Sequence, residues 1–254
     1  MSLLQLQQVD LTYPSRQGLV HALSAVSLTV AAGEFICVVG PSGCGKTTLL
    51  KLVAGLLFPT SGAALIDGRL ITGPAADRGI VFQQPALYPW LTVADNVAFG
   101  LQIRRVARAE RQARVAALLD LVGLSAFGQQ APYELSGGMQ QRAAIARVLV
   151  NAPRIMLMDE PFGALDALTR EHMQEELLKI WRTTRTTIIL ITHSVEEAVY
   201  LGTRVLVMSP RPGRVVADVP VSFSQEAGDS RAIKASSAFV AEREAILNYI
   251  WREQ

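Results

Sequence analysis

The chain has 254 residues, of which 50% are hydrophobic and 18% charged, and its formal net charge is +2 at pH 7. This length suits one large domain or two closely joined lobes, and the nearly balanced charge provides no basic block for nucleic acid, which we do not expect as a partner. Charges, prolines or glycines interrupt every long apolar stretch, and residues 1–5 lack the segments of a secretory signal, so we expect neither a membrane-spanning helix nor export.

Segments with strand character alternate with helical patterns along most of the chain. The expected strands are at residues 3–9, 35–39, 79–83, 154–158 and 187–191. This alternation predicts the α/β fold class with a mostly parallel sheet. Strand signals are missing between residues 92 and 150, where an inserted helical lobe is expected with helices at 92–101, 108–122 and 137–150.

The most informative motif follows the apolar run at residues 35–39 and reads Gly40-Pro41-Ser42-Gly43-Cys44-Gly45-Lys46-Thr47-Thr48. It predicts a loop whose backbone N–H groups cradle a nucleotide β-phosphate at a helix N-terminus. Its glycines permit close approach of the backbone, Lys46 can reach the β- and γ-phosphate oxygens, and the Thr47 hydroxyl can ligate Mg²⁺. The two cysteines, Cys37 and Cys44, are too few for a disulfide framework or a metal site.

A second motif is the pair Asp159 and Glu160, which follows the apolar residues 155–158. Consecutive side chains of a strand point to opposite faces, so the two carboxylates are expected to have separate tasks. We assign Asp159 to Mg²⁺, held through water, and Glu160 to the nucleophilic water. Taken alone, the pair would indicate a solvated strand end, but the phosphate loop upstream favours the catalytic interpretation.

A third motif, Ser136-Gly137-Gly138, opens a long helical segment. A hydroxyl and two glycines at a helix N-terminus form another candidate anion site. By itself Ser136 would be interpreted as a plain N-cap residue, and it gains a ligand role only from the other two motifs.

In their order along the chain, which is phosphate loop, Ser136-Gly137-Gly138 and carboxylate pair, the motifs resemble the ATP-binding cassette (ABC) family over roughly residues 3–220. The resemblance implies a P-loop NTPase fold with a mostly parallel core sheet, an N-terminal antiparallel β region and an α-helical subdomain inserted at about residues 86–152. It implies an ATPase domain at residues 1–224 and a tail with an amphipathic helix at residues 225–254. The implied cofactors are ATP and Mg²⁺, and two copies would form a head-to-tail homodimer in which Ser136-Gly137-Gly138 of one copy completes the nucleotide site of the other.

The family pattern also gives roles to four residues outside these motifs. It implies that Tyr13 stacks on adenine, Gln83 senses Mg²⁺ and the attacking water, Asp166 signals across the dimer and His193 contacts the γ-phosphate. Without that pattern, Tyr13 would be a core aromatic, Gln83 a strand cap and His193 a structural histidine. The implied catalytic set is Glu160 with Gln83 and His193.

One residue departs from the commonest signature of the family. Met139 stands where that signature has glutamine. We expect altered hydrogen bonding at the signature without loss of turnover, because the serine and both glycines remain.

Large apolar residues follow Gln83 in the run Ala86-Leu87-Tyr88-Pro89-Trp90-Leu91. In ABC transporters this region receives a short coupling helix of the membrane subunit, and aromatic residues commonly anchor interfaces. We therefore expect docking here. The alternative is that Tyr88 and Trp90 only anchor the helical lobe.

Within the ABC family, residues 73–79, 89–90 with 95–101, 161–166 and 212–215 resemble the importers of nitrate, sulfonates and taurine. The tail segments 230–234 and 239–244 are most similar to the ATPases of taurine importers. The leading hypothesis is an ATPase subunit for taurine import at the cytoplasmic face of the bacterial inner membrane. Its implied partners are two transmembrane permease subunits and, indirectly, a periplasmic solute-binding protein.

Three alternatives to this hypothesis stay open. The first is an importer of other aliphatic sulfonates or nitrate, since the solute is contacted by other subunits. The second is a soluble ABC ATPase, although those proteins commonly carry paired cassettes or large inserted arms. The third, a regulatory module without turnover, is disfavoured by the presence of Lys46, Asp159, Glu160 and His193.

Overall fold

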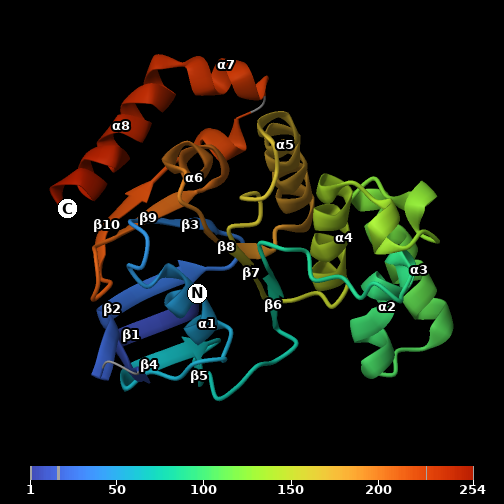
Figure 1. The fold of residues 1–254 in the computed structure, drawn as a ribbon, viewed down its shortest axis with the longest axis horizontal. Helices are drawn as coiled ribbons and strands as arrows, with labels where there is room; N and C mark the ends of the chain where they lie inside the picture. The colour runs from blue at the N-terminus through green and yellow to red at the C-terminus, as the bar shows by residue number, and fades with distance from the viewer. Residues whose placement is uncertain (1, 16–17, 227, 254) are drawn as a thin grey trace. The chain divides into compact units, whose positions relative to one another are not determined.

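The computed structural model describes residues 2–15, 18–226 and 228–253, which divide into two compact units (Figure 1). The first unit combines Met1–Ala75 with Arg185–Gln254, and the second is Ala76–Thr184. The first unit therefore contains the two ends of the chain, and the second is contributed by one continuous segment between them.

An antiparallel sheet forms the N-terminal part of the first unit. Its strands are β1 (Ser2–Ser15), β2 (Gly18–Ala31), β4 (Ser61–Ile66) and β5 (Arg69–Leu70), in the order β2-β1-β4-β5. Val26, Leu28 and Val30 alternate with exposed residues along β2, as expected for a sheet with one buried face. This sheet is the antiparallel region that the family resemblance implies, and Tyr13 lies near the end of β1.

A fully buried strand, β3 (Phe35–Val39), lies at the centre of the first unit. It pairs in parallel with β8 (Thr187–Ile191) and β9 (Arg204–Met208), and β10 (Val215–Pro220) pairs antiparallel with β9. Continuous burial along β3 and β8 is typical of parallel strands covered on both faces. The helical segments of this unit are α1 (Lys46–Val53), α6 (Val195–Leu201), the 3₁₀ turn Phe223–Gln225, α7 (Ser230–Ala235) and α8 (Ser237–Arg252).

The second unit is mostly helical. It contains two parallel strands, β6 (Arg78–Val81) and β7 (Ile155–Asp159), and the helices α2 (Val93–Ile103), α3 (Arg108–Leu121), α4 (Gly137–Leu149) and α5 (Ala167–Thr184), with 3₁₀ turns at Ser125–Phe127 and Pro132–Glu134. The helices expected at 92–101, 108–122 and 137–150 correspond to α2, α3 and α4. The strand expected at 79–83 ends earlier, at Val81, because the exposed residues Phe82 and Gln83 already belong to the following loop.

These elements confirm the expected α/β fold. Parallel pairs join β3 to β8 and β9, and β6 to β7, while β1, β2, β4 and β5 form a separate antiparallel sheet. Among the helices of the described residues, none is both long and apolar enough to cross a bilayer.

The C-terminal helices pack on the first unit. α8 contacts α6, β9 and β10, and its Phe239 and Ile246 are fully buried. The ring of Phe239 meets that of Phe223 edge to face, with 5.0 Å between their centroids. Val240 and Trp251 lie on the exposed side of the same helix, so α8 is amphipathic, as expected from the sequence.

We predict that Phe239→Ala lowers the free energy of unfolding by about 3–5 kcal/mol, because it removes a fully buried aromatic ring and leaves a cavity. The neighbouring Val240→Ala, on the exposed side of α8, is the matched control and should change it by less than about 0.5 kcal/mol. Urea denaturation of the full chain measures both. Equal effects of the two substitutions would contradict the packing of α8 described above.

Candidate nucleotide-binding site

The predicted phosphate loop follows directly from β3, and two of its glycines are required by its path. Gly40 and Gly45 have φ angles of 153° and 105°, in the region that favours glycine. A Cβ at Gly40 would lie 2.7 Å from the carbonyl oxygen of Met208, and one at Gly45 would lie 2.8 Å from that of Ala22. The loop can therefore turn tightly at the end of β3 only because these residues have no side chain.

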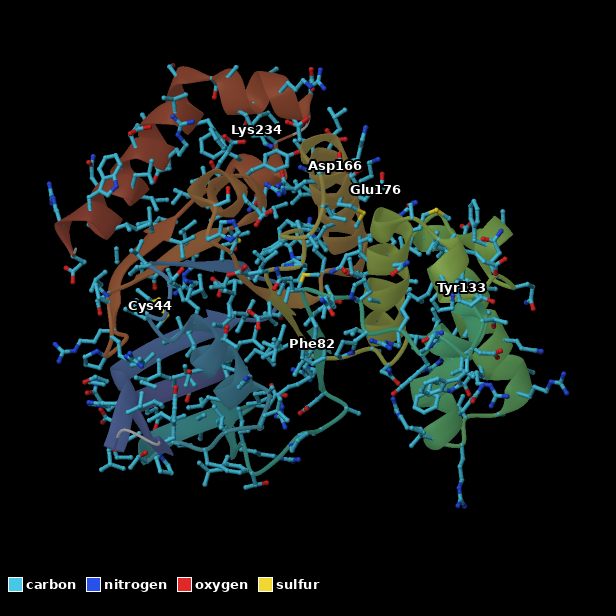
Figure 2. All side chains as sticks on the ribbon, in the orientation of Figure 1. Cys44, Phe82, Tyr133, Asp166, Glu176 and Lys234 are labelled. Carbon is cyan, nitrogen blue, oxygen red and sulfur yellow. The ribbon has the colours of Figure 1, made fainter. Side chains whose placement is uncertain are left out.

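Lys46 is the first residue of α1 and lies inside the turn of this loop. Its ammonium group donates hydrogen bonds to the carbonyl oxygens of Gly40 and Pro41, at 2.8 and 3.1 Å, and lies 3.8 Å from Sγ of Cys44. Gly45 provides no side-chain cap for α1, an arrangement typical of helix N-termini that receive phosphate. The buried thiol of Cys44, labelled in Figure 2, packs under the loop, which fits the expectation of a small loop residue.

The remaining predicted residues of the loop lie around this lysine. Ser42, Gly43 and Thr47 are exposed, whereas Pro41 and Thr48 are half-buried. Thr47, which the sequence assigns to Mg²⁺, and the loop residues Ser42 and Gly43 are therefore open to a ligand, while Lys46 is buried beside them.

His193 lies at the same edge of the first unit as the phosphate loop. Val38 of β3 is in register with Ile191 of β8, and the carboxyl ends of parallel strands share one edge of a sheet. The N–H of Thr192 donates to the carbonyl oxygen of Val38 at 3.2 Å, and the N–H of Ser194 donates to Oγ1 of Thr192 at 3.0 Å. His193 is exposed between these two anchored residues.

Tyr13 also belongs to the first unit, on the antiparallel sheet. It pairs with Val20 of β2 and is 37% exposed. This exposure removes the alternative of a tyrosine enclosed in the core and leaves the ring available for stacking.

The two predicted carboxylates lie at the end of β7 in the second unit. Asp159 is the last residue of the strand, and both Asp159 and Glu160 are half-buried. Glu160 has a φ of 47°, a left-handed backbone conformation that is uncommon for residues other than glycine. Its carbonyl oxygen accepts from the N–H of Gly163 at 3.1 Å, which closes a tight turn. Such backbone strain is common at functional sites.

Gln83 lies close to this turn. Val81 of β6 is in register with Met158 of β7, so the residues that follow the two strands leave the pair at the same end. A Cβ added to Gly163 would lie only 3.1 Å from Nε2 of Gln83, which shows that the Gln83 amide lies against the loop after Glu160. The structure therefore brings Gln83 and Glu160 into one region of the second unit.

The predicted signature lies at the start of α4. Ser136 is the N-cap, and its Oγ accepts from the N–H of Met139 at 3.3 Å. Ser136 and Gly137 are exposed, whereas Gly138 is buried, and a Cβ at Gly138 would lie 3.0 Å from Cγ2 of Thr169. Ser136 is therefore an N-cap residue, as the simpler interpretation predicted, and it is exposed at the surface.

Asp166, labelled in Figure 2, precedes α5 and is exposed. Its Oδ1 accepts from the N–H of Thr169 at 3.0 Å. Hydrogen bonds from the Thr169 side chain and then from its backbone N–H lower the pKa of Asp166, so this carboxylate is ionised near neutral pH.

The donor set suits Mg²⁺. Thr47, Gln83 and Asp159 all provide oxygen atoms, which are the ligands that Mg²⁺ prefers. In the part of the chain that the structure describes, no three His, Cys, Asp or Glu side chains gather as a metal cage.

The aromatic run after Gln83 separates into an anchored and an exposed residue. Tyr88 packs against Phe99, with ring centroids 4.7 Å apart, and the guanidinium of Arg147 lies 5.6 Å from the Tyr88 ring. Trp90 is 76% exposed. Tyr88 therefore anchors the helical lobe, as the alternative proposed, while Trp90 is available for a partner.

Two polar residues that hold this run were missed in the sequence. Asn96 is fully buried, accepts from the N–H of Tyr88 at 2.8 Å and donates to the carbonyl oxygens of Tyr88, Leu91 and Thr92. Arg147 donates to the carbonyl oxygens of Ala86 and Pro85, at 2.7 and 3.1 Å. An asparagine within the apolar segment 93–101 was the only signal for the first of them.

Comparison with known proteins agrees with this geometry. Residues 23–163 match the family described as "ABC transporter". The chain is 53% identical over 254 residues to the "Taurine import ATP-binding protein TauB" of Pelagibacter ubique, covering 99% of this chain and 96% of that protein. It is 56% identical over 234 residues to the protein of the same name from Roseobacter denitrificans, covering 91% and 87%.

A solved structure with the same fold is the dimeric post-hydrolysis state of the ATP-binding cassette MJ0796 bound to ADP and phosphate. It has a TM-score of 0.74 and 33% sequence identity, and the match covers 87% of this chain and 99% of that one. The phosphate loop, the signature and the paired carboxylates follow one another in this order within the matched family region. The chain therefore belongs to the ABC transporter family.

Proposed function

We propose that this chain is the ATP-hydrolysing subunit of an ABC importer that takes taurine into a bacterial cell. The main support for ATPase activity is the phosphate loop, which turns tightly around Lys46 at the end of β3. His193 lies at the same edge of the sheet. The cargo rests on the taurine import proteins described above, whose likeness extends over nearly the whole chain, including the tail.

In the proposed mechanism, the phosphates of ATP enter the loop of residues 40–48. Lys46 exchanges the carbonyl oxygens of Gly40 and Pro41 for β- and γ-phosphate oxygens, while loop N–H groups and the positive end of α1 stabilise the negative charge. Tyr13 stacks on the adenine ring. Thr47, Asp159 and Gln83 would hold Mg²⁺, which would supply further charge neutralisation on the phosphates.

Hydrolysis then requires an aligned water molecule rather than a covalent intermediate. Glu160 accepts the proton of this water, and Gln83 positions it, which agrees with the adjacency of the Gln83 amide to the turn after Glu160. His193 contacts the γ-phosphate from the end of β8.

A second copy completes each site in this proposal. The signature has two exposed residues, Ser136 and Gly137, followed by the buried Gly138. These three residues would contact the γ-phosphate of the ATP that is bound to the other copy. Asp166, kept ionised by Thr169, would transmit the state of one site to the other. Closure of the homodimer around two ATP molecules, and its release after hydrolysis, provides a two-state element that can move a partner.

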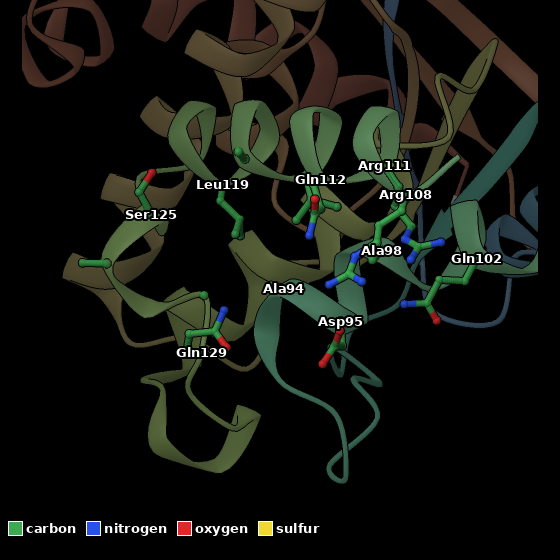
Figure 3. A pocket seen from close by; sticks show the side chains of 14 residues that line it. Ala94, Asp95, Ala98, Gln102, Arg108, Arg111, Gln112, Leu119, Ser125 and Gln129 are labelled. Carbon is green, nitrogen blue, oxygen red and sulfur yellow. The ribbon is translucent and has the colours of Figure 1, made fainter. Parts of the chain in front are cut away.

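The partner that receives this motion is proposed to be a pair of permease subunits in the inner membrane, with a periplasmic binding protein acting through them. A pocket of about 580 Å³ in the second unit, between α2 and α3, suits a short helix of such a subunit (Figure 3). Its apolar lining residues include Ala98, Val115 and Leu119, and its polar lining residues include Arg108 and Arg111. The chain would thus lie at the cytoplasmic face of the membrane.

An importer of other aliphatic sulfonates or nitrate is the second candidate. The ATPase machinery would be the same, because the residues assigned above contact nucleotide and none of them reads the solute.

We predict that Glu160→Gln keeps the ATP affinity of the wild-type chain and lowers kcat for hydrolysis by about 100-fold or more, because it removes the general base but no phosphate ligand. Lys46→Ala is the matched comparison and should lose ATP affinity itself. Equilibrium binding of ATP and phosphate release measure the two properties. Turnover of Glu160→Gln near the wild-type rate would disprove the role of Glu160.

We predict that Trp90→Ala weakens the complex with the permease by about tenfold or more, because a large exposed aromatic is a common interface anchor. ATP binding by the isolated chain should not change. Tyr133→Ala is the control, since Tyr133 is 77% exposed on the same unit, close to the 76% of Trp90. Co-purification with the permease measures the effect, and an equal loss for both variants would argue against docking at Trp90.

A further inference from the structure

The short helix α6 begins two residues after His193 and has only seven residues. A helix of this length has little stability of its own, so its position depends on what packs against it. α6 contacts β3 and β9 as well as α8 and the 3₁₀ turn Phe223–Gln225 of the C-terminal region. Two sets of contacts therefore hold the helix that follows His193, and one of them comes from the tail (Figure 1).

A lysine of the tail contacts α6 near both of its ends. Nζ of Lys234 lies 3.5 Å from Oε1 of Glu196, in the first turn of α6, and 4.9 Å from the ring centroid of Tyr200, in the last turn. Arg243 of α8 approaches the other carboxylate oxygen of Glu196 at 3.9 Å. The Lys234 side chain, labelled in Figure 2, is only 12% exposed, so solvent screens its contacts less than those of a surface pair.

The tail holds Lys234 in a defined place. Ser236 joins α7 to α8: its hydroxyl donates to the carbonyl oxygen of Ile233 at 2.7 Å and accepts from the N–H of Phe239 at 3.2 Å. Phe239 is fully buried against Phe223, and Ile233 is also buried. The ammonium group therefore reaches α6 from a packed element rather than from a loose terminus.

His193 lies in the short backbone segment that connects β8 to α6. Ser194 is the N-cap of α6, and its Oγ accepts from the N–H of Glu197 at 3.2 Å. On the other side, Thr192 is tied to Val38 of β3. His193 therefore lies between the anchored Thr192 and Ser194, the N-cap of α6, so only one residue separates it from this helix.

We propose that the C-terminal helix pair is a positioning element of the ATPase site, in which Lys234, assisted by Arg243, holds α6 through Glu196 and Tyr200 and thereby fixes His193. This inference rests on the proposed function, since it concerns the rate of ATP hydrolysis. Lys234 and Glu196 are positioning residues, because they act through His193 and do not themselves touch nucleotide.

The test uses the full chain and three substitutions. Lys234→Met and Glu196→Gln should each lower kcat for ATP about three- to fivefold, the range expected for losing a partly shielded ion pair and a cation–π contact, with KM for ATP unchanged. Lys234→Arg, which keeps the charge, should restore at least half of the wild-type kcat. The effect of the double variant should be smaller than the product of the two single effects, because both substitutions break the contact between Lys234 and Glu196.

A spectroscopic readout separates positioning from plain stability. The chain has three histidines, His21, His172 and His193, so the imidazole NMR signal of His193 can be assigned from its loss in His193→Ala. This signal should shift in Lys234→Met and in Glu196→Gln. It should stay in place in the control Arg252→Met, which removes an exposed cation from the last turn of α8.

Three results would overturn the proposal. One is an unchanged kcat with an unmoved His193 signal in Lys234→Met, and another is an equal effect of Arg252→Met. A loss of melting temperature or of ATP affinity in place of kcat would also contradict it, since that result indicates a structural brace alone. A wild-type chain without ATPase activity would instead refute the proposed function, while the His193 signal would still test the contact between the tail and α6.

Discussion

The close backbone packing at Gly40 and Gly45 is the constraint on which the nucleotide chemistry depends. A side chain at either residue would collide with a carbonyl oxygen of a neighbouring segment, at Met208 or Ala22. β3 cannot move to relieve such a collision, because all five of its residues are buried. Only a glycine turn therefore lets the chain leave this strand and fold its carbonyl groups around the ammonium of Lys46.

The proposed catalytic residues also lie at strand ends. His193 continues β8, beside the phosphate loop in the first unit, while Glu160 continues β7 and Gln83 follows β6 in the second unit. Each unit thus fixes its chemical groups where parallel strands end, the usual location of ligands in such sheets. The tail adds a further support to the first unit, because Lys234 contacts the helix that follows His193.

Much of this arrangement could be predicted from the sequence because motif and local structure agree. The loop of residues 40–48 follows from its glycines, and the helices of the second unit follow from their periodicity. The contacts of Arg147 and Lys234 could not be predicted, because each joins segments far apart in the chain. Those of Asn96 are local but depend on the path of the irregular loop before α2. Sequence spacing also could not distinguish Tyr88 from Trp90, since only the structure shows that Tyr88 packs against Phe99 while Trp90 is 76% exposed.

Uptake of radiolabelled taurine, compared with ethanesulfonate and nitrate, tests the central claim most directly. Cells would carry either the wild-type chain or Lys46→Ala, which removes the cation at the centre of the phosphate loop. The account predicts loss of taurine uptake in the Lys46→Ala cells while the uptake of the other two solutes persists. Undiminished taurine uptake in those cells would contradict it, and loss of only another solute would assign the ATPase to a different importer.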